Sequence, residues 1–214
     1  MRKLEMRKNN TKGRLITFCG LDGCGKSTMI EMLNDWLARM DKDVFLTKQP
    51  TDFVRNTPIF RTYMDNPNHD SYDYRSLSLL AASDRVQHCN KVILPQLEKG
   101  RYVISDRYMY SCIANLRARG YSNDMWIYEI AESIVKPDLA IVLDVPVDIA
   151  VARVRNRIAE KDSYIDMDLQ YRLRDEYLKL AETNGGIVLS SYRKAEETFS
   201  DIKSCFIKKL GGVI

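Results

Sequence analysis

Short runs of apolar residues recur along the chain and predict β-strands. The first run begins at Arg14 and ends at Cys19, and a glycine-bearing turn follows it at once. The run Leu139–Leu143 is apolar without alternation, which is typical of a strand buried on both faces of a sheet. The other predicted strands are Val44–Thr47, Tyr102–Ser105 and Gly186–Ser190.

Helical periodicity separates these strands. In Ser27–Met40 the apolar residues recur every three or four positions, and the same spacing runs through Asp70–Lys99. We expect Pro95 to kink or shorten the end of the second stretch, because proline interrupts the hydrogen-bond ladder of a helix. Further helices are predicted at Tyr110–Arg119, Asp124–Ser133, Val147–Ile158, Asp168–Thr183 and Glu196–Leu210.

The alternation of strands and helices predicts an α/β fold. Five parallel strands would form one sheet with helices on both faces, in three layers. The chain has 214 residues, which suits one such domain over residues 14–214. Residues 1–13 carry five Lys or Arg and are expected to be a flexible basic tail. A transit peptide fits this stretch less well, because it contains Glu5 and no Ser.

Composition narrows the class of protein. The chain is 45% hydrophobic and 29% charged, as in ordinary globular proteins. No stretch approaches the ~20 apolar residues that cross a bilayer, so we expect no membrane partner. The net charge of +4 is small and the basic residues are spread along the chain, so nucleic-acid binding is not expected. A ligand with several phosphates would explain some of the basic residues.

Cysteine and histidine usage argues against a metal centre built from these residues. The five cysteines are an odd number without a CxxC pair, which favours a reducing, cytoplasmic location and no structural zinc. The two histidines, His69 and His88, are isolated in the sequence and are expected to carry no chemistry.

A phosphate-binding motif follows the first predicted strand. Residues 20–27, GLDGCGKS, match G-x-x-x-x-G-K-[ST], and a predicted helix follows them, which disfavours a chance glycine-rich turn. Lys26 would contact the β- and γ-phosphates of ATP, and the hydroxyl of Ser27 would join the Mg²⁺ shell. The residues expected to bind ATP are Gly20, Leu21, Asp22, Gly23, Cys24, Gly25, Lys26, Ser27 and Thr28.

A carboxylate and an arginine follow the strand predicted at Tyr102–Ser105. Asp106 would lie at the sheet edge, where it could hold Mg²⁺ together with Ser27. Arg107 is adjacent and would contact phosphate. The same turn therefore presents one group for a cation and one for an anion.

Three arginines, Arg153, Arg155 and Arg157, precede a polar stretch that is suited to a mobile lid near residues 153–168. On a helix, Arg153 and Arg157 share a face. They could neutralise charge during phosphoryl transfer while the lid excludes water. A solvated basic helix face explains the periodicity equally well.

The motifs favour a small-molecule kinase over other P-loop proteins. No N-K-x-D segment for reading guanine occurs, and no LSGGQ-like segment suggests a transporter ATPase. The compact chain, the basic lid and the Asp106-Arg107 pair suit transfer of a phosphoryl group to a small acceptor.

From Arg14 onward the sequence resembles the thymidylate kinase family. The resemblance rests on GLDGCGKST at 20–28, TKQPT at 47–51, LLAASDRVQH at 79–88, DRY at 106–108 with Ser111, and PDLAIVLDVP at 137–146. It implies a P-loop nucleoside-monophosphate-kinase-like fold and ATP·Mg²⁺-dependent phosphorylation of dTMP to dTDP.

The resemblance also implies roles for individual residues. Asp22 matches the carboxylate that approaches the sugar and phosphate of the acceptor. Arg107 matches the arginine that grips the acceptor phosphate, and Arg85 the one that reaches the thymine ring. Because the P-loop lacks an arginine, the catalytic arginine would come from the lid, as Arg153 or Arg157. The remaining positions implied on the acceptor side are Lys48, in place of a family arginine, and Pro50, Ser111 and Tyr164.

Three positions depart from the family pattern. Ala81 stands where an aromatic side chain usually stacks on the base, Lys48-Gln49-Pro50 replaces Arg-Glu-Pro, and DSYI at 162–165 replaces the usual Asp-Arg-aromatic-Glu. Stacking on an aromatic ring is worth ~1–3 kcal/mol. Either another aromatic substitutes, from Tyr72, Tyr74 or Tyr108, or the acceptor is a different monophosphate or phosphorylated metabolite.

Two further alternatives stay open. The depleted lid also suits a nucleotide-binding homologue that has lost catalysis. Members of the family are commonly homodimers, and the apolar face of Asp70–Lys99 could form such a contact, although packing in the core explains that face as well.

Overall fold

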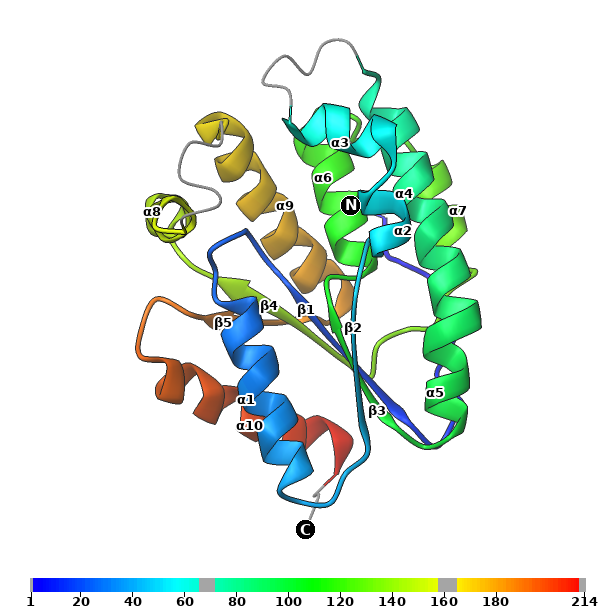
Figure 1. Ribbon diagram of the computed structural model, residues 1–214, viewed down its shortest axis with the longest axis vertical. Coiled ribbons are helices and arrows are strands. Elements are labelled where there is room, and N and C mark those ends of the chain that lie inside the picture. The colour runs from blue at the N-terminus through cyan, green and yellow to red at the C-terminus, as the bar shows by residue number, and fades with distance from the viewer. Residues whose placement is uncertain (1, 66–71, 158–164, 212–214) are drawn as a thin grey trace.

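A computed structural model describes residues 2–65, 72–157 and 165–211 of the chain (Figure 1). Its five strands form one parallel sheet in the order β2-β3-β1-β4-β5, which confirms the predicted fold class. The strands are β1 (Arg14–Cys19), β2 (Val44–Lys48), β3 (Tyr102–Asp106), β4 (Leu139–Asp144) and β5 (Ile187–Ser190).

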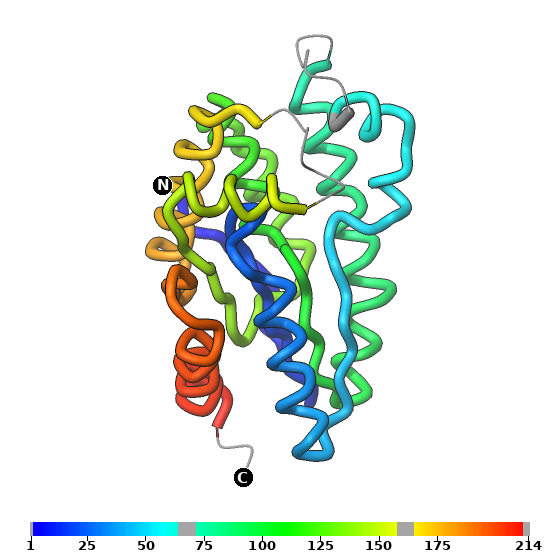
Figure 2. The backbone as a smooth tube through the Cα atoms, turned by 60° about the vertical axis from the view of Figure 1, so that its left-hand side comes forward, coloured from blue at the N-terminus to red at the C-terminus, as the bar shows by residue number. Residues whose placement is uncertain are grey.

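Helices cover both faces of this sheet. Helices α1 and α10 pack against each other on one face, while α5, α6 and α9 lie on the other, with α4 beside α6 (Figures 1 and 2). The helices are α1 (Lys26–Ala38), α2 (Asp52–Arg55), α3 (Pro58–Asp65), α4 (Tyr74–His88), α5 (Leu94–Glu98), α6 (Met109–Ala118), α7 (Trp126–Ala131), α8 (Val147–Arg155), α9 (Met167–Asn184) and α10 (Ala195–Leu210).

The central strand β1 carries the site. Its neighbours β3 and β4 follow it in the chain on opposite sides, so the strand order reverses at β1. In open α/β sheets, ligands bind beyond the carboxyl ends of the strands at such a point. Phe18 of β1 pairs with Asp106 of β3, so the P-loop leaves the sheet beside the Asp106-Arg107 turn.

The long helix predicted at Asp70–Lys99 is interrupted in the structure. Helix α4 passes into a π-helical turn, η2 (Cys89–Ile93), and then into α5, where Pro95 lies in the first turn. Proline has no N–H to donate to the preceding turn, so a change of helical register just before it is expected. The short helices α2 and α3 were not predicted.

The N-terminal segment packs against the domain. Leu4 is 5% exposed, and its backbone N–H donates to Oδ1 of Asn184 at 2.6 Å. Arg7 forms a parallel bridge with Val135. Residues 2–13 therefore depart from the flexible tail expected from the sequence. Within the described residues, no helix combines the length and apolar character needed to span a bilayer.

Candidate active site

The P-loop needs glycine at two positions where the chain touches its neighbours. A Cβ on Gly20 would lie 2.4 Å from the carbonyl oxygen of Leu143, and one on Gly23 would lie 2.2 Å from that of Ala150 in α8. Both glycines also have positive φ angles, 134° and 83°. The loop is therefore packed between β4 and α8. Helix α8 crosses near the start of α1 (Figure 2).

The start of α1 is open to an anion. Its N-cap, Gly25, is left-handed with φ 92°, supplies no side-chain cap, and no acidic residue lies in the first turn. The first amides and the positive end of the helix dipole therefore face the loop. Lys26 is only 7% exposed, and its Nζ donates to the carbonyl oxygen of Leu21 at 2.8 Å and to that of Gly20 at 3.3 Å. These contacts hold the ammonium group inside the loop.

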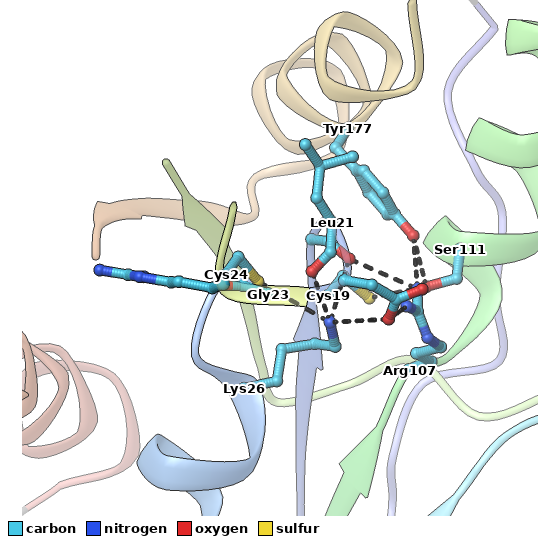
Figure 3. Close-up of polar contacts among 11 residues, drawn as sticks. Cys19, Leu21, Gly23, Cys24, Lys26, Arg107, Ser111 and Tyr177 are labelled. Carbon is cyan, nitrogen blue, oxygen red and sulfur yellow. Dashed lines mark hydrogen bonds and ion pairs between the residues drawn. The ribbon is translucent and has the colours of Figure 1, made fainter. Parts of the chain in front are cut away.

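Arg107 is fixed by its backbone and by a side chain from α9. Its φ of 64° is left-handed, and its backbone N–H donates to the carbonyl oxygen of Phe18 at 2.8 Å. Such a conformation costs ~1–3 kcal/mol outside glycine and marks functional positions. Nη1 of Arg107 donates to the hydroxyl of Tyr177 at 3.0 Å, and that hydroxyl donates to Ser111 (Figure 3). Sequence reasoning missed Tyr177, because it looks like an ordinary core residue of a helix.

One carboxylate joins the P-loop to the Arg107 turn. Oδ1 of Asp22 lies 3.8 Å from Nζ of Lys26 and 2.5 Å from Nη2 of Arg107. The positive charge of Arg107 lowers the pKa of Asp22 and outweighs the opposing effect of burial, with help from Lys26. Burial disfavours the charged form of Arg107, but Asp22 and Tyr177 more than offset this and raise the pKa of its guanidinium. Asp22 and Arg107 are therefore both charged at neutral pH.

Oxygen ligands for a cation lie on the other side of the loop. Ser27 and Asp106 line one open hollow, together with Thr47 and His88. Oδ1 of Asp106 is buried and has no hydrogen-bond partner among the described residues. A carboxylate oxygen and a hydroxyl suit Mg²⁺, which prefers hard oxygen ligands, so these residues fit the predicted metal site.

A cavity of about 280 Å³ opens beyond Asp22 and Arg107. Asp22, Pro50, Arg85, Arg107 and Ser111, all predicted to contact the acceptor, line this cavity. Lining residues not assigned to the acceptor beforehand are Arg55, Phe60, Tyr63, Leu77, Ser78, Cys112, Asn115, Arg119, Leu169, Gln170 and Leu173.

One predicted acceptor residue is not brought into this cavity. Lys48 is half-exposed, pairs with Asp52 at 2.8 Å, and lines the hollow beside Asp106. Tyr164 lies outside the described residues, as do His69 and the rest of residues 158–164 of the expected lid.

The cavity wall contains Ala81 and one of the three aromatic residues considered as substitutes for a stacking ring. Tyr74 lines the cavity, whereas Tyr72 does not, and Tyr108 is buried with its hydroxyl donating to the carbonyl oxygen of Val135.

Arg55 is a second arginine at the cavity that the sequence did not reveal. It lies at the end of α2, and its Nε donates to the carbonyl oxygen of Pro50 at 2.8 Å. Burial lowers the pKa of Arg55, and the charge of Arg107 lowers it further. Two guanidinium groups this close repel each other, which an anion between them would relieve. Only the four-residue helix α2 places Arg55 here, and so short an element has no clear periodicity in the sequence.

The two lid arginines differ in their surroundings. Nη1 of Arg153 donates to the carbonyl oxygens of Gly23 and Ser191, both at 3.3 Å, so it joins the P-loop to the segment after β5. Arg157 is exposed and lies close enough to Asp22 for its charge to lower the pKa of that carboxyl.

Comparisons with known proteins identify the family of this chain. The family model for thymidylate kinase matches residues 18–202. The probable thymidylate kinase of Pyrococcus abyssi is 38% identical over 94% of this chain and all of its own length. The thymidylate kinase of Geobacillus sp. WCH70 is 32% identical over 88% of this chain and 93% of its own length, and that of Prochlorococcus marinus is 33% identical over 93% and 98%. This chain belongs to the thymidylate kinase family.

Proposed function

We infer that this protein transfers the γ-phosphoryl group of ATP to dTMP, which yields dTDP and ADP. Family membership supports the reaction. The observation that carries the inference is the placement of Lys26 and Arg107 on either side of Asp22, between the P-loop and the 280 Å³ cavity. A donor triphosphate on one side and an acceptor phosphate on the other would meet at these charges.

The reaction needs alignment more than it needs a base. An oxygen of the acceptor phosphate forms a bond to the γ-phosphorus while the bond from that phosphorus to the β–γ bridging oxygen breaks. The second pKa of a phosphate monoester is ~6, so the attacking oxygen is already ionised at neutral pH. Fixed positive charge and in-line positioning therefore account for catalysis.

The donor side is assigned to the P-loop. The amides at the start of α1 and the ammonium of Lys26 would hold the β- and γ-phosphates. Ser27 and Asp106 would hold Mg²⁺, with the unpartnered oxygen of Asp106 as the supporting observation. When bound, the metal neutralises charge on the transferring group.

The acceptor side is assigned to Arg107 and Arg55. Both guanidinium groups line the cavity, and Arg107 presents planar donors that suit phosphate oxygens. Arg85 lines the same cavity from α4 and is assigned to the base. Lys48 is not assigned to the phosphate, because Asp52 holds it at the other hollow.

Of the two lid arginines, Arg157 is assigned to the transferring phosphoryl group. Its charge already acts on Asp22, which lies between donor and acceptor. Arg153 is a positioning residue, since its guanidinium is occupied by carbonyl oxygens of the P-loop and of the segment after β5.

A coupled assay of ADP release tests the function. The enzyme with ATP·Mg²⁺ is offered dTMP, dUMP, dCMP, dAMP and dGMP in turn, and dTMP should give the highest kcat/KM. Equal ADP release with and without dTMP would refute phosphoryl transfer to this acceptor. A higher kcat/KM with another monophosphate would replace dTMP as the substrate.

We also propose a homodimer in a reducing cytoplasm. The exposed Leu79 on α4 could contribute to a subunit contact, and the five cysteines are all unpaired thiols. Light scattering of the purified protein should give twice the 24.8 kDa chain mass. A mass of one chain at micromolar concentration would contradict the dimer.

A further inference from the structure

The cavity has two ends that are separated by the length of α6. Arg107 comes just before this helix and Arg119 just after it, and ten helical residues span ~15 Å. Asp22, Arg55 and Arg107 form what we call the phosphate end. Tyr63, Tyr74 and Arg119 line the other end, which we call the base end.

Helices α4 and α6 run antiparallel along the cavity. Arg85, late in α4, donates to the carbonyl oxygen of Tyr108, while Tyr74, at the start of α4, meets Arg119. A molecule with its phosphate at Arg107 would therefore have its base beside Ala81 and Arg85, with the base end beyond it.

Arg119 is held rigidly at the base end. Its guanidinium carbon lies 4.0 Å from the centre of the Tyr74 ring, a stacked cation–π contact. Nε donates to the hydroxyl of Tyr63 at 3.0 Å, and Nη1 donates to Oδ1 of Asn115 at 2.9 Å. The amide of Asn115 is itself fixed, since its Nδ2 donates to the carbonyl oxygen of Ser111 at 2.9 Å.

The charge of Arg119 has no anionic partner among the described residues. Its partners are neutral oxygens and rings, and within the described residues no carboxylate lies at salt-bridge distance from it. No hydrogen bond from its Nη2 to that part of the chain is formed either. A partly buried guanidinium that has no anionic partner there and keeps a donor nitrogen available is suited to bind a ligand, because contacts with neutral groups offset only part of its desolvation.

We propose that Arg119 determines base specificity, by donating a hydrogen bond to the carbonyl edge of the thymine from the base end. The inference rests on the proposed function. A guanidinium can donate but cannot accept. Thymine offers carbonyl oxygens as acceptors, whereas cytosine presents an amino donor at position 4. Two donor-only groups, Arg85 and Arg119, on one small cavity therefore favour a base with two carbonyl groups.

The same arrangement accounts for Ala81. An aromatic ring at this position would fill the middle of the cavity, and its absence leaves the Tyr74 ring and the stacked Arg119 as the wall that the base meets. The base would then be recognised by hydrogen bonds at the base end of the cavity instead of by stacking in its middle. Sites that hydrogen-bond a substrate reject analogues lacking the matching group more strongly than apolar sites do.

The test compares Arg119→Gln with the matched control Arg117→Gln. Arg117 also lies on α6, but it pairs with Glu176 and does not line the cavity. For Arg119→Gln we expect the ratio of kcat/KM for dTMP to that for dCMP to fall about tenfold or more, since an amide can accept from cytosine. KM for dTMP should rise while KM for ATP and kcat change little, and Arg117→Gln should keep the wild-type ratio.

Other outcomes separate the inference from the function. If the wild-type protein phosphorylates dTMP and Arg119→Gln keeps its dTMP-to-dCMP ratio, with equal losses on both acceptors, Arg119 is only structural and the inference is overturned. If the wild-type protein does not phosphorylate dTMP, the proposed function fails first.

Arg119→Lys is the milder variant if the glutamine variant does not fold. Calorimetry with thymidine, which lacks the phosphate, should then show weaker binding than wild type, and unchanged binding would overturn the inference.

Discussion

The phosphate end and the base end of the cavity are built in different ways. At the phosphate end, the charges of Asp22 and Arg107 come directly from motifs, the P-loop after β1 and the Asp106-Arg107 turn after β3, where the backbone includes left-handed residues. The base end is assembled from three helical segments, with aromatic rings and one arginine that has no carboxylate partner in the described part of the chain. The first end therefore has the chemistry that every member of the family needs, and the second has room to differ.

This contrast predicts that substitutions at the two ends have different signatures. At the phosphate end, all monophosphate acceptors should suffer alike, because every acceptor carries the same phosphate. At the base end, the ranking of acceptors should change while turnover survives.

Lys26→Ala should have the largest effect. Removing the ammonium from the P-loop deletes a charge that is assigned to the transferring group, and we expect kcat/KM to fall on the order of 10³-fold for every acceptor. Steady-state kinetics over the monophosphate panel measures this, with far-UV circular dichroism to verify folding. Turnover close to that of the wild type would show that the P-loop takes no part in the mechanism.

Arg157→Ala should come next, and Arg153→Ala provides its comparison. Loss of Arg157 should lower kcat on the order of 10²-fold with little change in stability, since its side chain is exposed. Loss of Arg153 should instead lower the thermal midpoint and weaken ATP binding, because two segments lose their common donor. If Arg153→Ala lowers kcat without changing the thermal midpoint or ATP binding, the roles assigned to Arg153 and Arg157 are reversed.

Arg55→Gln should have an intermediate effect, with Lys48→Gln as its control. A lost charge-assisted hydrogen bond to phosphate should raise KM about tenfold for all acceptors and leave the dTMP-to-dCMP ratio unchanged. Lys48 pairs only with the exposed Asp52, so its substitution should change KM by less than about twofold. A larger rise in KM for Lys48→Gln than for Arg55→Gln would support the expectation from the sequence that Lys48 contacts the acceptor phosphate.

The smallest effect concerns pH and stability. His88 is buried between Thr47 and Gln49, and burial lowers its pKa below the ordinary value of 6.5. The unfolded chain therefore binds a proton more readily, so the free energy of unfolding should fall as pH drops below 6.5. The charge of Asp84 favours protonation of His88 and so opposes part of this loss.

Denaturant titrations at pH 7.5 and 5.5 measure this loss. In His88→Asn the difference between the two pH values should shrink, because the titrating group is gone. An equal difference in both proteins would show that another group is responsible.

The sequence predicted the two ends unequally, for physical reasons. The P-loop and the Asp106-Arg107 turn are local, so spacing and residue type alone identify them. Arg55 depends on α2, a four-residue helix whose position is set by tertiary packing. Lys48 was expected at the acceptor because it stands in place of a family arginine, but its ion pair with Asp52 holds it at the other hollow.

The base end was harder still. Tyr63, Tyr74 and Arg119 come from three elements, and only the antiparallel packing of α4 and α6 brings Tyr74 to Arg119. The sequence showed that position 81 has no aromatic ring to stack on the base, and Tyr74 was one of the residues considered as a substitute. It could not show that an arginine from the far end of α6 stacks on that ring.

The N-terminal segment has a practical consequence. The family match begins at residue 18, yet Leu4 is buried and Arg7 pairs with Val135 at the edge of the domain. An expression clone that begins at Arg14, the first residue of β1, would leave Asn184 and Val135 without these contacts. We expect such a clone to be less soluble than the full chain, so affinity tags belong at the C-terminus.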